Sequence, residues 1–138
     1  MLVKDIMLPA YKIDANSTVA EAAKIMTEHN MGSIFIESHG KIQGIMTERD
    51  VVQKIATKGT DSRRIMVYEI MTSPIISVSG DTTLEQASEI MSKNRIRRLA
   101  IVDKGDIVGK VTSSLISKNM KYYLSVKLFR KEEHPNII

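Results

Sequence analysis

Hydrophobic residues recur with helical spacing in two parts of the chain, and each series follows a threonine that can cap a helix. Thr18 has Glu21 three positions later and Thr83 has Gln86, which is the capping-box pattern of a helix start. The apolar positions that follow recur every three or four residues, as one buried helix face requires. They are Val19, Ala22, Ala23 and Met26 in the first series, and Leu84, Ala87, Ile90 and Met91 in the second. The pattern predicts two amphipathic helices.

Two pairs of short apolar runs follow these helices, and a turn that contains glycine separates the members of each pair. Runs of this length and composition are typical of largely buried strands. The four predicted strands span residues 33–37, 42–46, 98–103 and 107–111. A further short strand precedes each helix, at 11–15 and 75–79, and a last helix begins at Thr47 and at Thr112. The order is therefore β-α-β-β-α, twice.

The two series are copies of one unit, because the sequence matches itself at an offset of 65 residues. The heptad GIMTERD at 44–50 recurs as GKVTSSL at 109–115, with Leu115 in place of Asp50. Upstream, DIM at 5–7 matches EIM at 69–71. We expect a first repeat over 1–57, a linker over 58–67, a second repeat over 68–120 and a basic tail over 121–138. Asp61 is expected to cap a short helix that runs into EIMT.

Composition and charge narrow the class of protein. The 138 residues are 43% hydrophobic and 26% charged, which is ordinary for a globular domain with a core. No apolar run is long enough to span a membrane, and the charged, proline-containing start is no secretory signal. The absence of cysteine excludes disulfides and thiolate metal sites, and a cytoplasmic location is the default expectation. The net charge of +4 favours anionic partners.

The heptad carries the most specific chemistry. Thr47 and Asp50 are three positions apart at a predicted helix start, so both lie on one face. A hydroxyl, free backbone N–H groups and a carboxylate would then meet at the positive helix end, which favours phosphate. A carboxylate accepts two hydrogen bonds, so Asp50 can hold both ribose hydroxyls. The alternative is that the pair only caps the helix. Because Leu115 replaces Asp50 in the second repeat, we predict two unequal sites.

Patterns typical of enzymes are missing. The histidines are scattered without metal-ligand spacing, and no glycine-rich phosphate loop or nucleophile elbow occurs. Glu48 and Asp50 are two positions apart and so point to different helix faces, which argues against a pair of catalytic carboxylates. We expect no catalytic residue, no metal site, no required cofactor and no enzyme activity.

The repeats resemble the tandem cystathionine-β-synthase (CBS) domain pair, from about residue 3 to residue 120. The resemblance is carried by DIM, by EIMTSPIISVSGDTTLEQA, by IRRLAIVDKGDIVG and by the two heptads. It implies the mixed α/β class (α+β), with two β-α-β-β-α repeats packed as a pseudo-twofold sandwich. It also implies two clefts between the repeats that hold adenosine-type ligands.

The resemblance implies roles for individual residues. In the family, the threonine matching Thr47 contacts phosphate and the aspartate matching Asp50 contacts ribose. The adenine wall of that cleft would come from the start of the second repeat. The other ligand-binding residues implied are Thr72, Ile75, Ile76, Ile96, Thr112, the basic Arg97 and Arg98, and their small first-repeat counterparts Gly32 and Ser33. Alternation along the strand places Arg97 on the side of Leu99, whereas Arg95 and Arg98 fit a solvated strand end equally well.

The function expected is a regulatory module that binds an adenine nucleotide, with AMP, ADP or ATP as ligand, and reports its level to an unidentified regulated protein. S-adenosylmethionine or NAD sensing, nucleic-acid binding and a purely structural dimerisation module remain alternatives. A homodimer is expected, through apolar residues of the helices at 48–56 and 113–120. Basic and aromatic residues mix in the tail, which fits either single-stranded nucleic acid or a packed helix with Met120, Leu124 and Leu128 on one face. We favour the packed helix.

Overall fold

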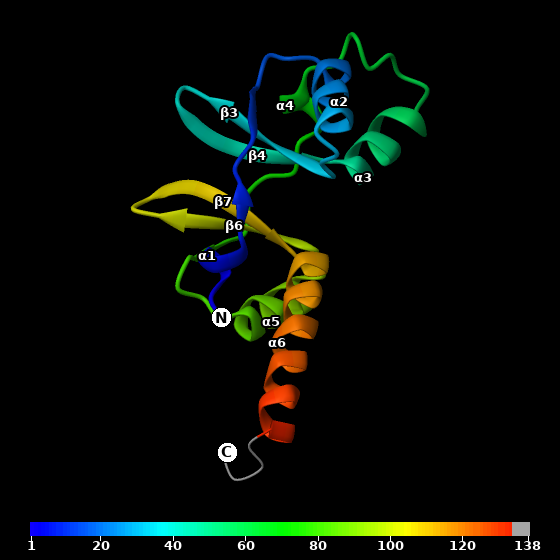
Figure 1. Ribbon diagram of the computed structural model, residues 1–138. Coiled ribbons are helices and arrows are strands. Elements are labelled where there is room, and N and C mark those ends of the chain that lie inside the picture. The colour runs from blue at the N-terminus through cyan, green and yellow to red at the C-terminus, as the bar shows by residue number, and fades with distance from the viewer. Residues whose placement is uncertain (134–138) are drawn as a thin grey trace. The chain divides into compact units, whose positions relative to one another are not determined.

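The computed structural model describes residues 1–133, apart from the side chains of Tyr123 and of residues 126–133. The chain divides into two compact units. The first-repeat unit comprises Pro9–Ile76. The second-repeat unit comprises Met1–Leu8 together with the chain from Ser77 onward. Each unit therefore contains one sheet and the helices that cover it, and the two are described separately (Figure 1).

The first-repeat unit is built on a three-stranded sheet of order β2-β3-β4, with β2 parallel to β3 and β3 antiparallel to β4. The strands are β2 (Lys12–Asp14), β3 (Ser33–Ser38) and β4 (Lys41–Thr47). Helix α2 (Val19–Glu28) joins β2 to β3. After β4 the chain forms α3 (Glu48–Val51), the π-helical turn η1 (Val52–Ala56) and the short helix α4 (Val67–Ile70).

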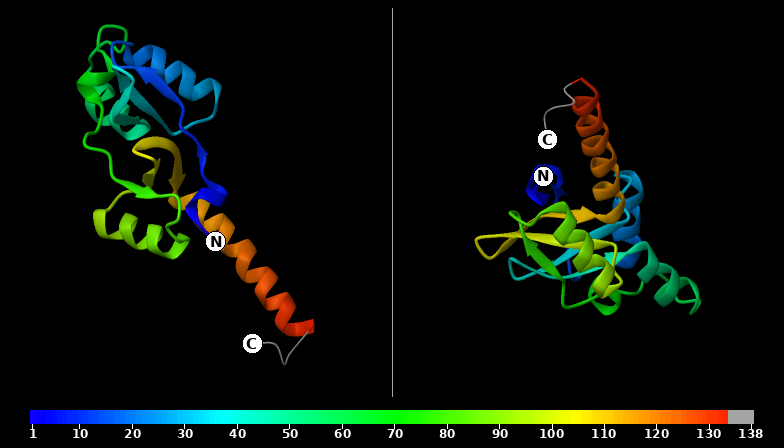
Figure 2. Two further views of the ribbon diagram at one scale, coloured as in Figure 1. Left: turned by 90° about the vertical axis from the view of Figure 1, so that its left-hand side faces the viewer. Right: turned by 90° about the horizontal axis from the view of Figure 1, so that it is seen from below.

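The second-repeat unit repeats this plan on a sheet of order β1-β7-β6-β5. The strands are β1 (Leu8–Pro9), β5 (Ser77–Ser79), β6 (Arg98–Asp103) and β7 (Asp106–Thr112). The helices are α1 (Val3–Ile6), α5 (Leu84–Asn94) and α6 (Ser113–Glu133), and Figure 2 shows α6 continuing well past α5. The predicted mixed α/β class and the predicted order of elements in both repeats are confirmed.

Both long helices start where the sequence predicts. The Thr18 hydroxyl accepts a hydrogen bond from the Glu21 amide at 3.1 Å, and the Glu21 carboxylate accepts one from the Thr18 amide at 3.2 Å. Thr83 and Gln86 form the same pair of bonds at 3.1 and 3.0 Å. Each capping box satisfies two amides that the helix itself leaves unpaired, which is why these threonines begin the helices.

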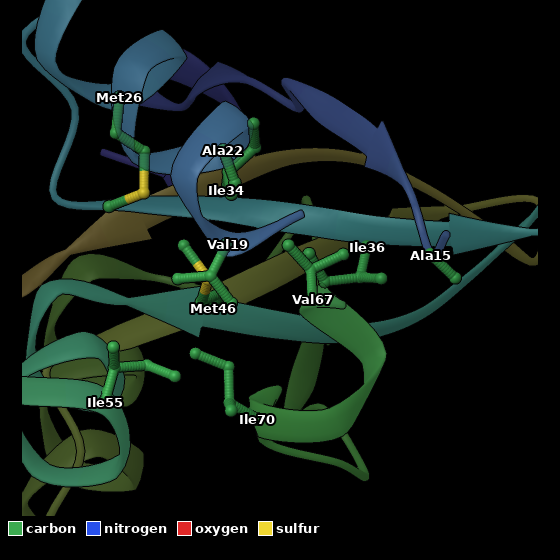
Figure 3. Packing of buried hydrophobic residues seen from close by; sticks show 10 residues of the cluster. All are labelled: Ala15, Val19, Ala22, Met26, Ile34, Ile36, Met46, Ile55, Val67 and Ile70. Carbon is green, nitrogen blue, oxygen red and sulfur yellow. The ribbon is translucent and has the colours of Figure 1, made fainter. Parts of the chain in front are cut away.

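One apolar cluster fills the space between the sheet and the helices of each unit. Figure 3 shows the first-repeat cluster, in which Val19, Ala22 and Met26 of α2 meet Ile34 and Ile36 of β3. The second-repeat cluster uses the matching positions. It comprises Val3, Leu84, Ala87, Met91, Leu99, Ile101, Val111 and Ile116. The helical periodicity of the sequence therefore marks the buried faces correctly.

The short helices α1 and α4 are exchanged between the repeats. Helix α1 belongs to the second-repeat unit, where the Val3 amide donates to the Thr82 carbonyl at 2.8 Å. Helix α4 belongs to the first-repeat unit, where the Val67 amide donates to the Ser17 carbonyl at 2.9 Å. Val3 and Val67 are both fully buried. The matching DIM and EIM motifs are thus docking segments, and each completes the unit built mainly from the other repeat.

One expectation about local structure is wrong, and another is confirmed only in part. Asp61 does not cap α4, which starts after Met66; its carboxylate instead accepts bonds from Arg63, because the chain turns at 62–64. The packed-helix interpretation of the tail holds for Met120, which contacts the core, but Leu124 is exposed on α6. Leu128 and the basic and aromatic tail side chains from residue 126 onward lie outside the described part of the chain.

In the part of the chain that the structure describes, no helix is long and apolar enough to cross a membrane.

Candidate ligand-binding site

The end of β4 and the start of α3 hold Thr47 and Asp50 in a capping box. The Thr47 hydroxyl accepts a hydrogen bond from the Asp50 amide at 3.2 Å. Asp50 Oδ2 accepts one from the Thr47 amide at 2.8 Å and lies 3.1 Å from the Thr47 hydroxyl. The pair therefore does cap the helix, as the simpler interpretation of the heptad proposes. This geometry also fixes the direction in which the carboxylate points.

Asp50 is 7% exposed and is surrounded by polar side chains of the same unit. The Thr72 hydroxyl donates to Asp50 Oδ1 at 3.2 Å, and the ammonium of Lys54 lies 3.0 Å from the same oxygen. The ladder between Thr72 and Ile45, with N–O distances of 2.8 and 3.0 Å, brings Thr72 to this position. Three side chains from two segments, residues 47–54 and the stretch after α4, thus meet at one buried carboxylate. We name this group the Asp50 cluster: Thr47, Asp50, Lys54 and Thr72.

Lys54 was not among the residues that the sequence pointed to. It lies four positions after Asp50, the spacing at which opposite charges pair along a helix, so the pattern was available. Its ammonium also donates to the Ile70 carbonyl at the end of α4, at 2.8 Å. Lys54 lies within the π-helical turn η1, and such turns often occur at functional sites. The residue therefore joins the Asp50 carboxylate to the exchanged helix.

The backbone amides at the start of α3 are less available than predicted. The Glu48 amide donates to the Gly32 carbonyl at 3.1 Å, and the Asp50 amide is bound by Thr47. Helix α3 continues directly into η1, so the peptide dipoles of residues 48–56 still add at this end. Lys54 adds a full positive charge 3.0 Å from the carboxylate.

Four further candidate residues belong to the first-repeat unit. Ser33 is buried and pairs in register with Thr47, and Gly32 precedes it as the carbonyl partner of Glu48. Ile75 is half-buried and Ile76 is exposed, both in the segment between Thr72 and β5.

The second-repeat unit has an apolar counterpart of the Asp50 cluster. Thr112 still caps its helix, accepting from the Leu115 amide at 3.1 Å. Leu115 packs against the core, where Asp50 has its polar partners. Asn119 takes the place of Lys54 and donates to the Leu115 carbonyl at 2.8 Å, while Leu8 takes the place of Thr72. The predicted inequality between the two heptads thus extends to three positions.

The basic residues before β6 differ in their surroundings. Arg97 is exposed, whereas Leu99 is in the core, so the strand alternation does not reach back to Arg97, because β6 begins at Arg98. Arg98 is half-buried and pairs in register with Thr112. Lys110, which the sequence did not single out, is 7% exposed on β7; burial lowers its pKa, and the Arg98 guanidinium lowers it further.

The remaining candidate, Ile96, is half-buried and packs against the second-repeat core. Over the described residues, no group of three or more histidine, aspartate or glutamate side chains is placed to hold a metal ion.

Two α/β units from one repeated sequence, each with a capped helix after a β-hairpin, define a tandem-repeat α/β protein. The CBS domain family model matches residues 3–57 and 67–121, and the chain belongs to that family. The predicted resemblance to a tandem CBS pair is thus confirmed. Such pairs are generally regulatory and bind ligands.

Individual relatives agree with this assignment. The chain is 35% identical over 118 residues to the CBS domain-containing protein YhcV of Bacillus subtilis, covering 85% of this chain and 84% of the relative. Several other curated relatives are longer proteins, of which the chain spans between 22% and 62%. These longer relatives include inosine-5′-monophosphate dehydrogenases, so CBS pairs also occur within enzymes.

Solved structures share the fold. A Burkholderia ambifaria protein described as a candidate signal-transduction protein with CBS domains gives a TM-score of 0.76 at 28% identity, covering 80% of this chain and 81% of that one. The hexameric CBS-CP12 protein of bloom-forming cyanobacteria gives 0.79 at 30% identity, covering 86% and 71%. Proteins with this fold therefore include one assigned to signalling and one that assembles with itself.

Proposed function

We propose that this chain is a regulatory module that binds an adenine nucleotide, with Asp50 holding the ribose hydroxyls. The observation that carries the proposal is the Asp50 cluster: a carboxylate 7% exposed, with two hydroxyl partners and one ammonium partner from two chain segments. A helix cap alone needs only Thr47 and Asp50, as Thr18 and Glu21 illustrate in the same chain. The additional partners support a second role for Asp50.

The remaining residues take the roles that the family resemblance implies. The adenine ring would contact Thr72, Ile75, Ile76 and Ile96, and the phosphate would meet Thr47. Arg97 and Arg98 belong to the second repeat with Thr112 and would hold an anionic group there. Gly32 and Ser33 leave room beside Thr47 because they are small, and Thr112 would serve a second, weaker site without a ribose acceptor. Neither enzyme activity nor a required cofactor is part of this proposal, and the cytoplasmic location stays a prediction.

Calorimetric titration of the chain with AMP, ATP, S-adenosylmethionine, a short RNA and a short DNA tests the proposal. We expect an adenine nucleotide to bind at one site per chain, since the second-repeat unit has Leu115 where the acceptor belongs. Nucleic-acid binding in its place, weakening steeply with added salt, would support the alternative that uses the net charge of +4. If the chain binds none of these ligands, the result supports the third alternative, a purely structural dimerisation module.

We also propose a homodimer, with a second copy covering the groove between α2 and α3. The groove has a volume of about 370 Å³ and is lined mainly by apolar groups. Its lining residues are Ala23, Met26, Thr27, Asn30, Met31, Glu48, Val51 and Val52. Val52 at its edge is 56% exposed, which favours burial against another apolar surface. Self-association of the CBS-CP12 neighbour supports the choice of a second copy.

Light scattering after gel filtration is expected to give twice the 15.5 kDa chain mass at micromolar concentration. Val52→Lys places a charge in the groove and should shift the protein to the monomer. Val108→Lys is the matched control, because Val108 is also exposed but lies on β7 in the second-repeat unit and does not line the groove. A monomeric parent protein, with and without AMP, would contradict the dimer.

A further inference from the structure

The acceptor sites of the Asp50 carboxylate are already occupied without a ligand. Oδ2 has the Thr47 amide at 2.8 Å and the Thr47 hydroxyl at 3.1 Å, and Oδ1 has the Thr72 hydroxyl at 3.2 Å and the Lys54 ammonium at 3.0 Å. A carboxylate offers about four lone-pair sites. A ribose diol can therefore bind Asp50 only by displacing at least one of these donors.

Lys54 is the donor best placed to leave. The Thr47 amide is fixed by the start of α3, and its loss would uncap the helix. The Lys54 side chain is 39% exposed, so its ammonium can move toward solvent or toward a ligand while the long aliphatic stem stays in place. When it leaves Asp50 it keeps a partner in the Ile70 carbonyl, at 2.8 Å.

Displacement has a different cost for different ligands. A neutral nucleoside would break the ion pair between Lys54 and Asp50 and return only hydroxyl groups to the carboxylate. A nucleotide brings an anionic group that the released ammonium can pair with, so the charge interaction lost is replaced. The amides of Glu48 and Asp50 already have partners and offer the anion little, so the released Lys54 ammonium would add a charge-assisted contact to that of Thr47.

We infer that Lys54 determines specificity at this site: it pairs with Asp50 in the free protein and with the anionic group of the ligand in the complex, and so selects nucleotides over neutral nucleosides. The inference rests on the proposed function. The second-repeat unit carries Asn119 and Leu115 at the matching positions, so it has neither the competing cation nor the carboxylate.

The test compares the dissociation constants of AMP and adenosine by calorimetry for the parent chain and for Lys54→Met. The substitution should weaken AMP about tenfold, because a charge-assisted contact is lost. It should tighten adenosine severalfold, because Asp50 no longer has a competing cation. Lys54→Arg should restore the preference for AMP, since the charge returns. Lys58→Met is the matched control: it removes the same charge from an exposed position on the turn after η1 and should change neither constant.

A change of both constants in the same direction, or no change in their ratio, would overturn the role of Lys54 and leave it a structural residue. The proposed function fails differently: in that case the parent chain binds neither ligand, or Asp50→Ala binds both as tightly as the parent. Urea unfolding of each variant shows that the folded protein is being compared. Opposite shifts for the two ligands support the inference, because loss of packing would weaken both.

Discussion

Replacing Gly44 by alanine is expected to lower the free energy of unfolding by about 1–3 kcal/mol, because the added carbon has no room. A Cβ at this position would lie 2.6 Å from the sulfur of Met71 and 2.9 Å from the Thr72 carbonyl oxygen. The Met71 side chain can move, but the Thr72 carbonyl is held in a two-bond pairing with Ile45. Relief therefore requires the exchanged segment after α4 to shift away from β4.

Urea denaturation measures this effect, and Gly80→Ala is the matched control. A Cβ on Gly80 would lie 3.2 Å from the Lys4 side chain and farther from all other atoms, so we expect a smaller loss. Gly109→Ala should resemble Gly44→Ala, since its Cβ would lie 2.8 Å from the Leu8 carbonyl oxygen. If Gly44→Ala is no less stable than Gly80→Ala, the close approach of the segment is not what requires glycine.

The glycines explain why the heptad keeps part of its pattern in both repeats. Gly44 and Gly109 let α4 and α1 dock across a strand, and Thr47 and Thr112 cap the helix that follows. These are structural requirements of the fold, and they apply to both units. Asp50 is different, because the cap at Thr112 forms with leucine in its place. The position that differs between the copies is therefore the one to test for function.

The repeated fold could be predicted because its signals are local. Thr18 and Glu21 mark a helix start within four residues, and the apolar periodicity after them marks the buried face. The exchange of α1 and α4 leaves no such signal. Val3 and Val67 contact residues of the other repeat, and a short apolar segment gives no indication of which sheet it will cover.

The site was predictable only in part, for a similar reason. Thr47 and Asp50 are neighbours in the sequence, so their meeting follows from helix geometry. Thr72 meets Asp50 across 22 positions because α4 is exchanged, and geometry of that kind cannot be read from spacing. The prediction of free backbone amides at the start of α3 was wrong for Glu48, because its amide donates to the Gly32 carbonyl of a different segment.

Asp50→Ala is expected to weaken AMP binding by about 10- to 100-fold, if the carboxylate holds the ribose through charge-assisted hydrogen bonds. It should also cost stability, since the Thr47 amide loses its acceptor and Lys54 keeps only the Ile70 carbonyl. A loss of about 1–2 kcal/mol fits the removal of a cap and a partly buried ion pair. Calorimetry and urea unfolding measure the two effects separately.

Asp50→Asn separates the ligand contact from the cap. Its side-chain oxygen can still accept from the Thr47 amide, so most of the stability should return. The negative charge that strengthens the bonds to a diol is gone, so AMP binding should remain weak. Glu48→Gln is the control, because it removes one negative charge from an exposed position on the same helix and should leave affinity unchanged. Parent-like AMP affinity in both Asp50 variants would show that the carboxylate is a helix cap and nothing more.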